Sequence, residues 1–193
     1  MSDSPVFRSP VLTSYTAAST DAPLTLSDET PTSRTLLRAS PGGPTADHLG
    51  VAYGASRVDG DVLVAGSRVD EWLLIGPAQA VADRVAELPT EEHVSVIDWT
   101  HGRAMFRLTG EPATGALEKV CGLDWSDDMT PDGAVVSGSV AKVSCDVIRS
   151  DRGDAPSYLI LCDRSFGQYL FDTLIDAADE FGVDVNVNVN VKA

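Results

Sequence analysis

Three neighbouring polar residues, Asp98, Thr100 and His101, are the strongest candidates for catalytic chemistry in this sequence. They follow an apolar stretch, residues 94–98, that reads as a strand, so a carboxylate, a hydroxyl and an imidazole would meet at its end. One interpretation makes His101 a general base that is oriented by Asp98. In the other interpretation the side chains of Asp98 and Thr100 hydrogen-bond to the backbone of a turn, and His101 is an exposed loop residue. The residue types favour the second interpretation.

A group of acidic residues lies in a stretch that reads as a loop, and it comprises Asp124, Asp127, Asp128 and Asp132. Carboxylate oxygens are the ligands that Ca²⁺ and Mg²⁺ prefer. An EF-hand loop, however, needs carboxylates at strictly alternate positions and a distal Glu, and this stretch has neither. The spacing therefore favours a solvated acidic loop over a cation site.

The remaining reactive residue types do not form a recognisable site. The three cysteines are widely spaced, with no C-x-x-C, and the three histidines lack metal-ligand spacing. We expect Cys121, Cys145 and Cys162 to be buried and to pack like small hydrophobic side chains. In a reducing cytoplasm their thiols would not form disulfides. Asp70 and Glu71 are adjacent on a predicted strand and face opposite ways, so they would not share a site. Ser165 has no G-x-S-x-G around it, and with Gln168 it predicts a helix capping box.

The charge balance excludes several partners. The 193 residues include 14 Lys and Arg against 29 Asp and Glu, for a net charge of −15, with no basic run. Nucleic-acid and anionic-membrane binding are therefore not expected. The longest apolar stretch, residues 72–82, is too short to span a bilayer, and the first ten residues do not resemble a secretory signal, which predicts a cytoplasmic location. Salt adaptation, a GC-rich genome and a positively charged partner each explain the acidity.

Residues 1–50 are rich in Ser, Thr, Pro and Gly and show weak hydrophobic periodicity. Runs such as residues 40–44, Ser-Pro-Gly-Gly-Pro, are typical of loops, because Pro fixes φ and removes a hydrogen-bond donor. We expect an irregular or partly disordered arm, with one isolated strand over residues 35–38.

Residues 51–183 alternate between strand-like and helix-like hydrophobic patterns. Strands are expected at 58–65 (folded at an Asp59-Gly60 turn), 71–76, 94–98, 104–108, 134–140, 143–149 and 158–162, and helices at 77–88, 112–121 (closed by a left-handed Gly122) and 165–181 (closed by Gly182). Strands in pairs with helices between them predict an α+β domain of antiparallel sheets with covering helices. Residues 184–193, with alternating Val and Asn, read equally well as an edge strand or a tail.

Three segments in this order resemble the gamma subunit of heterotetrameric sarcosine oxidase. They are residues 69–77 (VDEWLLIGP), residues 96–124 with VIDWTHGR and CGLD, and the closing helix at residues 164–182. The motif residues that carry the resemblance, read as structural, are Asp70, Glu71, Trp72, Asp98, Gly102, Arg103, Gly110, Cys121, Asp124, Arg164, Ser165, Phe166 and Tyr169.

The same layout is similar to the folate-binding fold of the glycine-cleavage aminomethyltransferases. Those enzymes carry a loop of the N-x-x-G-G-x-x-D-D kind between two strands, and its acidic residue works at folate. This sequence has SVAKVSCD at residues 139–146, without the glycines and the paired acids. The departure speaks against aminomethyl transfer by this chain.

The resemblance implies a noncatalytic subunit of a complex that converts sarcosine, oxygen and tetrahydrofolate to glycine, hydrogen peroxide and methylene-tetrahydrofolate. It places NAD, FAD and a folate site on an alpha subunit, flavin (FAD or FMN) on a beta subunit and zinc on a delta subunit. No cofactor ligand is carried over to a residue of this chain. The alternative is a stand-alone folate-binding one-carbon protein that uses Asp98 or His101.

Overall fold

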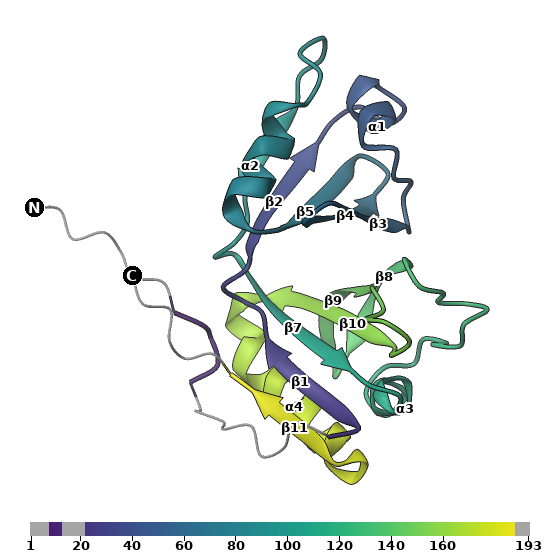
Figure 1. The fold of residues 1–193 in the computed structure, drawn as a ribbon. Helices are drawn as coiled ribbons and strands as arrows, with labels where there is room; N and C mark the ends of the chain where they lie inside the picture. Colours follow the sequence, from purple (N-terminus) through teal and green to yellow (C-terminus); the bar gives the residue numbers. More distant parts are fainter. Residues whose placement is uncertain (1–7, 13–21, 188–193) are drawn as a thin grey trace, which may run out of the picture.

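The structure, a computed structural model, describes residues 8–12 and 22–187 and contains two β-sheets and four α-helices (Figure 1). In chain order the elements are β1 (Leu24–Asp28), β2 (Ser33–Arg38), α1 (Pro44–Leu49), β3 (Ser56–Asp59), β4 (Val62–Arg68), β5 (Glu71–Gly76), α2 (Ala78–Ala86), β6 (Ser95–Asp98), β7 (Arg103–Thr109), α3 (Ala113–Glu118), β8 (Val135–Val140), β9 (Val143–Arg149), β10 (Ser157–Asp163), the 3-10 turn η1 (Arg164–Phe166), α4 (Gly167–Ala178), η2 (Asp179–Phe181) and β11 (Val183–Asn186).

The strands form two sheets that are antiparallel except at one edge. The six-stranded sheet has the order β11-β1-β7-β10-β9-β8, and the five-stranded sheet has the order β3-β4-β5-β2-β6. Only β1 and β11 pair in parallel among the described strands. The α+β fold class with antiparallel sheets and covering helices is thereby confirmed.

Three clusters of buried side chains show that the molecule is built of four layers (Figure 1). The first cluster joins α3 and α4 to the six-stranded sheet, and in it the rings of Phe106 and Phe171 lie 5.0 Å apart. The second contains Met105 and fills the space between the two sheets. The third, with Leu74 and Val81, joins the five-stranded sheet to α1 and α2. Each sheet therefore has helices on its outer face and the other sheet on its inner face.

The expectation of an irregular arm over residues 1–50 is wrong for residues 24–49. Strand β1 pairs with β7 inside the six-stranded sheet, and β2 lies between β5 and β6 rather than alone. In β1 the buried Leu24, Leu26 and Asp28 alternate with the half-buried Thr25 and Ser27, which is the period of two that a strand with one covered face shows. The fold therefore begins well before residue 51, while residues 1–7 and 13–21 of the predicted arm lie outside the described part of the chain.

The strands and helices expected between residues 51 and 183 are present, with two differences at helix ends. Helix α4 has no side-chain cap, so the Ser165 capping box is wrong: the Gln168 carboxamide instead accepts a hydrogen bond from the Leu12 amide at 2.6 Å and donates one to Asp172. Gly122 does not adopt the left-handed conformation, since α3 ends at a right-handed Lys119, whereas Gly182 does adopt it.

Of the two alternatives for the C-terminal segment, an edge strand or a tail, the described residues form an edge strand. Residues 183–186 form β11 and pair with β1 at the edge of the six-stranded sheet. The rest of the predicted tail, residues 188–193, lies outside the described residues. No helix in the described part of the chain is both long and apolar enough to cross a lipid bilayer.

Candidate functional site

The space between the two sheets holds several of the buried charges of the molecule, among them Arg107 and Asp146. Alternation along β7 turns Ala104, Phe106 and Leu108 toward the helices and Met105 toward the other sheet. Arg103 and Arg107 share the inner face with Met105. Each of these two arginines belongs to a polar cluster, and the two clusters lie on either side of the apolar Met105.

The first cluster surrounds the buried carboxylate of Asp146 on β9. Arg103 contacts it at 3.1 Å and Arg68 at 3.2 Å, and the Ser137 hydroxyl donates to it at 2.6 Å. The Arg103 guanidinium also lies over the Trp99 ring, 4.9 Å from its centroid. Asp146 thus connects β4 of the five-stranded sheet with β7 and β8 of the six-stranded sheet, and its carboxylate is fully engaged.

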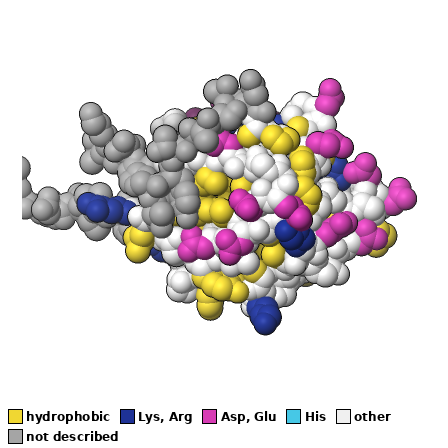
Figure 2. Space-filling model, turned by 90° about the horizontal axis from the view of Figure 1, so that it is seen from below, with side chains coloured by type: hydrophobic (Ala, Val, Ile, Leu, Met, Phe, Trp, Pro, Cys, Tyr) yellow, Lys and Arg dark blue, Asp and Glu magenta, His cyan; other side chains and the backbone are white. Residues whose placement is uncertain are grey.

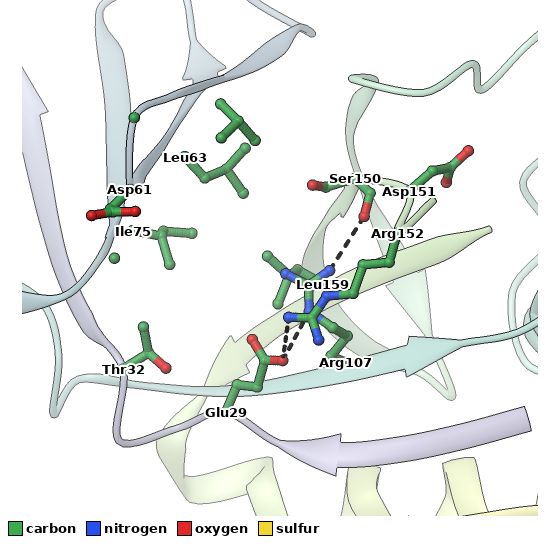
Figure 3. Close-up of a pocket in the computed structure, with 13 residues that line it drawn as sticks. Glu29, Thr32, Asp61, Leu63, Ile75, Arg107, Ser150, Asp151, Arg152 and Leu159 are labelled. Atoms are coloured by element: carbon green, nitrogen blue, oxygen red, sulfur yellow. Dashed lines mark hydrogen bonds and ion pairs between the residues drawn. The ribbon is translucent and has the colours of Figure 1, made fainter. Parts of the chain in front are cut away.

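The second cluster lines a hollow of about 360 Å³ between the sheets, shown in Figure 3. Glu29 accepts hydrogen bonds from Arg107 at 2.9 Å and from Arg152 at 3.2 Å, and Arg107 also donates to the Ser157 hydroxyl at 2.9 Å. Leu63 and Ile75 line the opposite wall (Figure 3). The volume is at the low end of small-ligand sites.

The chemistry available in this hollow is limited. Burial lowers the pKa of Arg107, and the Glu29 carboxylate opposes that shift by holding the guanidinium charged. Arg107 and Glu29 thus neutralise each other, while the Arg152 side chain is 59% exposed at the rim. In the Asp146 cluster the Ser137 hydroxyl does meet a carboxylate, but that carboxylate is already paired with Arg68 and Arg103 and is therefore a poor general base.

Sequence reasoning missed Arg34, a fully buried arginine on β2. It lies where two segments, residues 29–32 and 99–102, pass from one sheet to the other. Its Nη2 donates to the carbonyl oxygens of Thr30 at 2.9 Å, of Arg103 at 3.0 Å and of Thr100. Burial lowers the pKa of Arg34 to about 10. The available signal was that alternation along β2 puts Arg34 on the same face as buried Leu36.

The candidate catalytic trio at residues 98–101 is a turn. The Asp98 carboxylate accepts a hydrogen bond from the Thr100 amide at 2.9 Å, and the Thr100 hydroxyl accepts one from the Arg34 amide at 3.0 Å. The hydrogen bonds from Thr100 lower the pKa of Asp98, so its carboxylate is a weaker base than usual. This geometry supports the turn interpretation over one in which Asp98 orients His101.

The acidic loop is also used structurally. Asp124 accepts from the Ser126 amide at 2.9 Å, and Asp132 accepts from the Asp151 amide at 2.9 Å. Asp127 pairs with Arg149 at 2.6 Å. In the described ranges, 8–12 and 22–187, no three His, Cys, Asp or Glu side chains are grouped as they would be to hold a metal ion.

The family-motif residues occupy four separate places in the fold. In the five-stranded sheet the Asp70 carbonyl accepts from the Ala39 amide, Glu71 pairs with Arg38 and the Trp72 indole donates to the Val51 carbonyl. Asp98, Gly102, Arg103 and Arg164 meet near the crossover, where the Arg164 amide donates to the Gly102 carbonyl at 3.3 Å. Gly110, Cys121 and Asp124 flank α3, and Ser165, Phe166 and Tyr169 are exposed at the start of α4.

Of these exposed residues, Tyr169 makes a further contact within the fold. The Tyr169 hydroxyl donates to the Ala141 carbonyl at 3.1 Å, which connects α4 to the turn between β8 and β9. In that turn Ala141 and Lys142 both have positive φ, the conformation of a tight two-residue hairpin. The segment at residues 139–146, where the resemblance to the aminomethyltransferases would place an acidic loop, is therefore a compact hairpin.

Comparisons with known proteins agree with the motifs. Residues 48–180 match the family described as sarcosine oxidase, gamma subunit family (SoxG). A search of curated protein sequences gave no match. One chain of the heterotetrameric sarcosine oxidase from Corynebacterium sp. U-96 is 27% identical with a TM-score of 0.72, over 86% of this chain and 89% of that one.

A second solved structure shares the fold alone. It is the glycine cleavage system aminomethyltransferase T from Bartonella henselae, with 15% identity and a TM-score of 0.65. The alignment covers 86% of this chain and 48% of that enzyme, so this chain spans about half of its length. The family match extends over more than half of the sequence and includes the first two motifs and residues 164–180 of the third. This chain therefore belongs to the sarcosine oxidase gamma subunit family.

Proposed function

We propose that the chain acts as the noncatalytic gamma subunit of a heterotetrameric, flavin-dependent sarcosine oxidase. The observation that carries the proposal is the family match over residues 48–180 together with the alignment to most of one chain of the Corynebacterium complex. The complex would oxidise sarcosine to glycine in a reaction linked to tetrahydrofolate one-carbon metabolism. The chain's own part would be to bind and position its partner subunits.

The chemistry is then assigned to the partners. The buried charged residues of the inter-sheet layer are engaged with one another, as Asp146 with Arg103 and Glu29 with Arg107. We expect FAD, FMN and NAD on alpha and beta subunits and zinc on a delta subunit. The cytoplasmic location indicated by the sequence remains a prediction.

The surface charge supports a partner of opposite sign. Figure 2 shows Asp and Glu side chains around exposed hydrophobic ones on the face that carries α4 in Figure 1. On α4 the exposed acids include Asp172 and Asp176, and the net charge of the chain is −15. A basic partner surface would associate with such a face faster and more selectively than a neutral one.

Co-expression tests the proposal. The tagged chain is produced together with the alpha, beta and delta chains of a sarcosine oxidase operon from the same genome, and the purified material is analysed for flavin absorbance and sarcosine-dependent peroxide formation. We expect a flavin-containing complex that holds this chain in a fixed ratio. A chain that elutes as a free monomer, with the flavoprotein in other fractions, would disprove the proposal.

One of the two residues that the stand-alone folate-binding alternative would use, Asp98, accepts a hydrogen bond from the Thr100 amide and so serves the turn. Titration of the isolated chain with tetrahydrofolate, followed by calorimetry, separates the two functions. Saturable binding that is lost in His101→Ala would favour the alternative.

A further inference from the structure

Two of the three cysteines lie directly opposite each other on neighbouring strands. Cys145 on β9 is the register partner of Cys162 on β10, and both side chains belong to the buried cluster that joins α3 and α4 to the six-stranded sheet. All three cysteines are free, and Cys121 lies near the end of α3. The pairing of Cys145 with Cys162 was not visible in the sequence, where the two residues are far apart.

The hydrogen-bond pattern of the β9–β10 ladder shows that Cys145 and Cys162 form a non-hydrogen-bonded pair, the kind with the shorter Cα–Cα distance. The Ser150 amide donates to the Ser157 carbonyl at 2.8 Å, which makes Ser150 and Ser157 a hydrogen-bonded pair of the β9–β10 ladder. Hydrogen-bonded and non-hydrogen-bonded pairs alternate along an antiparallel ladder. Cys145 and Cys162 lie an odd number of steps away and therefore form a non-hydrogen-bonded pair.

Position in the ladder sets the distance between the two backbones. In a non-hydrogen-bonded pair the Cα atoms are about 4.5 Å apart and the side chains leave on the same face. Disulfides occur at Cα separations of about 4.4 to 6.8 Å. A disulfide between these residues therefore needs rotation of the thiols but no rearrangement of the strands.

We propose that Cys145 and Cys162 form a redox-responsive dithiol that hydrogen peroxide converts to a cross-strand disulfide. One thiolate attacks a peroxide oxygen, which gives a sulfenic acid and hydroxide. The second thiol attacks the sulfenic sulfur, a disulfide forms and water leaves. In total two thiols and one peroxide give one disulfide and two waters, with sulfur oxidised and peroxide oxygen reduced.

The surroundings determine the rate and the outcome. Burial raises the pKa of Cys145 to about 12 and that of Cys162 to about 11, so few thiolates form at neutral pH and the first step is slow. The second step is intramolecular, and the neighbouring thiol captures the sulfenic acid before further oxidation. The pair therefore responds to sustained peroxide exposure. A source of peroxide beside this chain rests on the proposed function, whereas the reactivity of the pair does not.

Peptide mapping of the full chain tests the proposal without any partner. Reduced protein is incubated with hydrogen peroxide under native conditions, quenched with catalase, unfolded in the presence of N-ethylmaleimide and digested with trypsin. Cleavage after Lys and Arg puts the three cysteines on three separate peptides, residues 120–142, 143–149 and 153–164. We expect a species that joins 143–149 to 153–164, disappears on reduction, and leaves 120–142 labelled with maleimide.

Variants provide the matched controls. Cys121→Ser removes the third buried thiol and should leave the linked peptide unchanged, whereas Cys145→Ser and Cys162→Ser should abolish it. The proposal is overturned if both peptides remain maleimide-labelled after peroxide treatment, if the link forms only in denaturant, or if Cys121 is the partner. Because peroxide is added directly, this test does not depend on the proposed function. The disulfide can fail to form although the chain co-purifies with its partners, and it can form although the chain does not co-purify.

Discussion

The guanidinium of Arg34 donates a hydrogen bond to the main-chain carbonyl of Arg103 over 3.0 Å, and so joins β2 of one sheet to β7 of the other. The same nitrogen also reaches the carbonyls of Thr30 and Thr100. One buried side chain thus satisfies three carbonyl groups at the point where the chain passes twice between the sheets. Its removal should therefore affect both crossovers at once.

Arg34→Met should lower the free energy of unfolding by about 3 kcal/mol, because three carbonyls lose a buried donor. The measurement is equilibrium denaturation in urea. Arg38→Met is the matched control on the same strand: Arg38 is 56% exposed and pairs with Glu71, whose side chain is 13% exposed, so a smaller loss of about 1 kcal/mol is expected. Equal losses in both variants would contradict the role assigned to Arg34.

Asp146→Asn should destabilise the protein by about 2 kcal/mol, because the mostly buried Arg103 would lose its charged partner. Asp163→Asn is the control, since Asp163 contacts the same arginine at 3.7 Å but is 70% exposed, and its loss should cost at most about 0.5 kcal/mol. Thermal and urea denaturation of the two variants give the comparison. A larger effect for Asp163 would show that the cluster is not centred on Asp146.

Gly110→Ala should cost more than about 2 kcal/mol, because Gly110 has a φ of 141° and an added Cβ would collide with the Pro23 carbonyl at the start of β1. Gly122→Ala should change stability by no more than about 0.5 kcal/mol, since Gly122 is exposed and no atom lies within 4 Å of the position that an added Cβ would take. Urea denaturation midpoints test this pair. A tolerant Gly110 would contradict the close approach of β1.

Asp98→Ala should reduce stability by about 1 kcal/mol at neutral pH, because the hydrogen bond to the Thr100 amide is lost. The Thr100 hydrogen bonds lower the pKa of Asp98 from 3.8, so this contribution is complete above pH 3.8 and disappears as the pH falls through the lower folded-state value. The difference between wild type and variant, measured by urea denaturation across acidic pH, should therefore shrink at the acid end.

Asp98→Asn serves as the control for that titration, because its amide oxygen still accepts from Thr100 but carries no titrating proton. Its stability relative to Asp98→Ala should not vary with pH. A pH-independent difference between wild type and Asp98→Ala would show that the carboxylate does not bind the turn.

Local patterns predicted much of the fold because they depend on neighbours in the chain. The short apolar run at residues 71–76 and the helical spacing in residues 170–181 indicated the correct elements, since each pattern reflects the faces that its segment buries. Strand β1 was missed because its five residues hold only two apolar side chains, Leu24 and Leu26, beside proline- and serine-rich sequence. Its place was set by β7, to which it pairs.

The sequence by itself determined the acidic surface, the α+β class and the three motifs by which the family is recognised. Only the tertiary structure decided that Asp146 receives two arginines, that Arg34 spans both sheets and that Cys145 faces Cys162. The physical reason is that a strand's period of two fixes which side chains share a face, while long-range pairing fixes what that face meets.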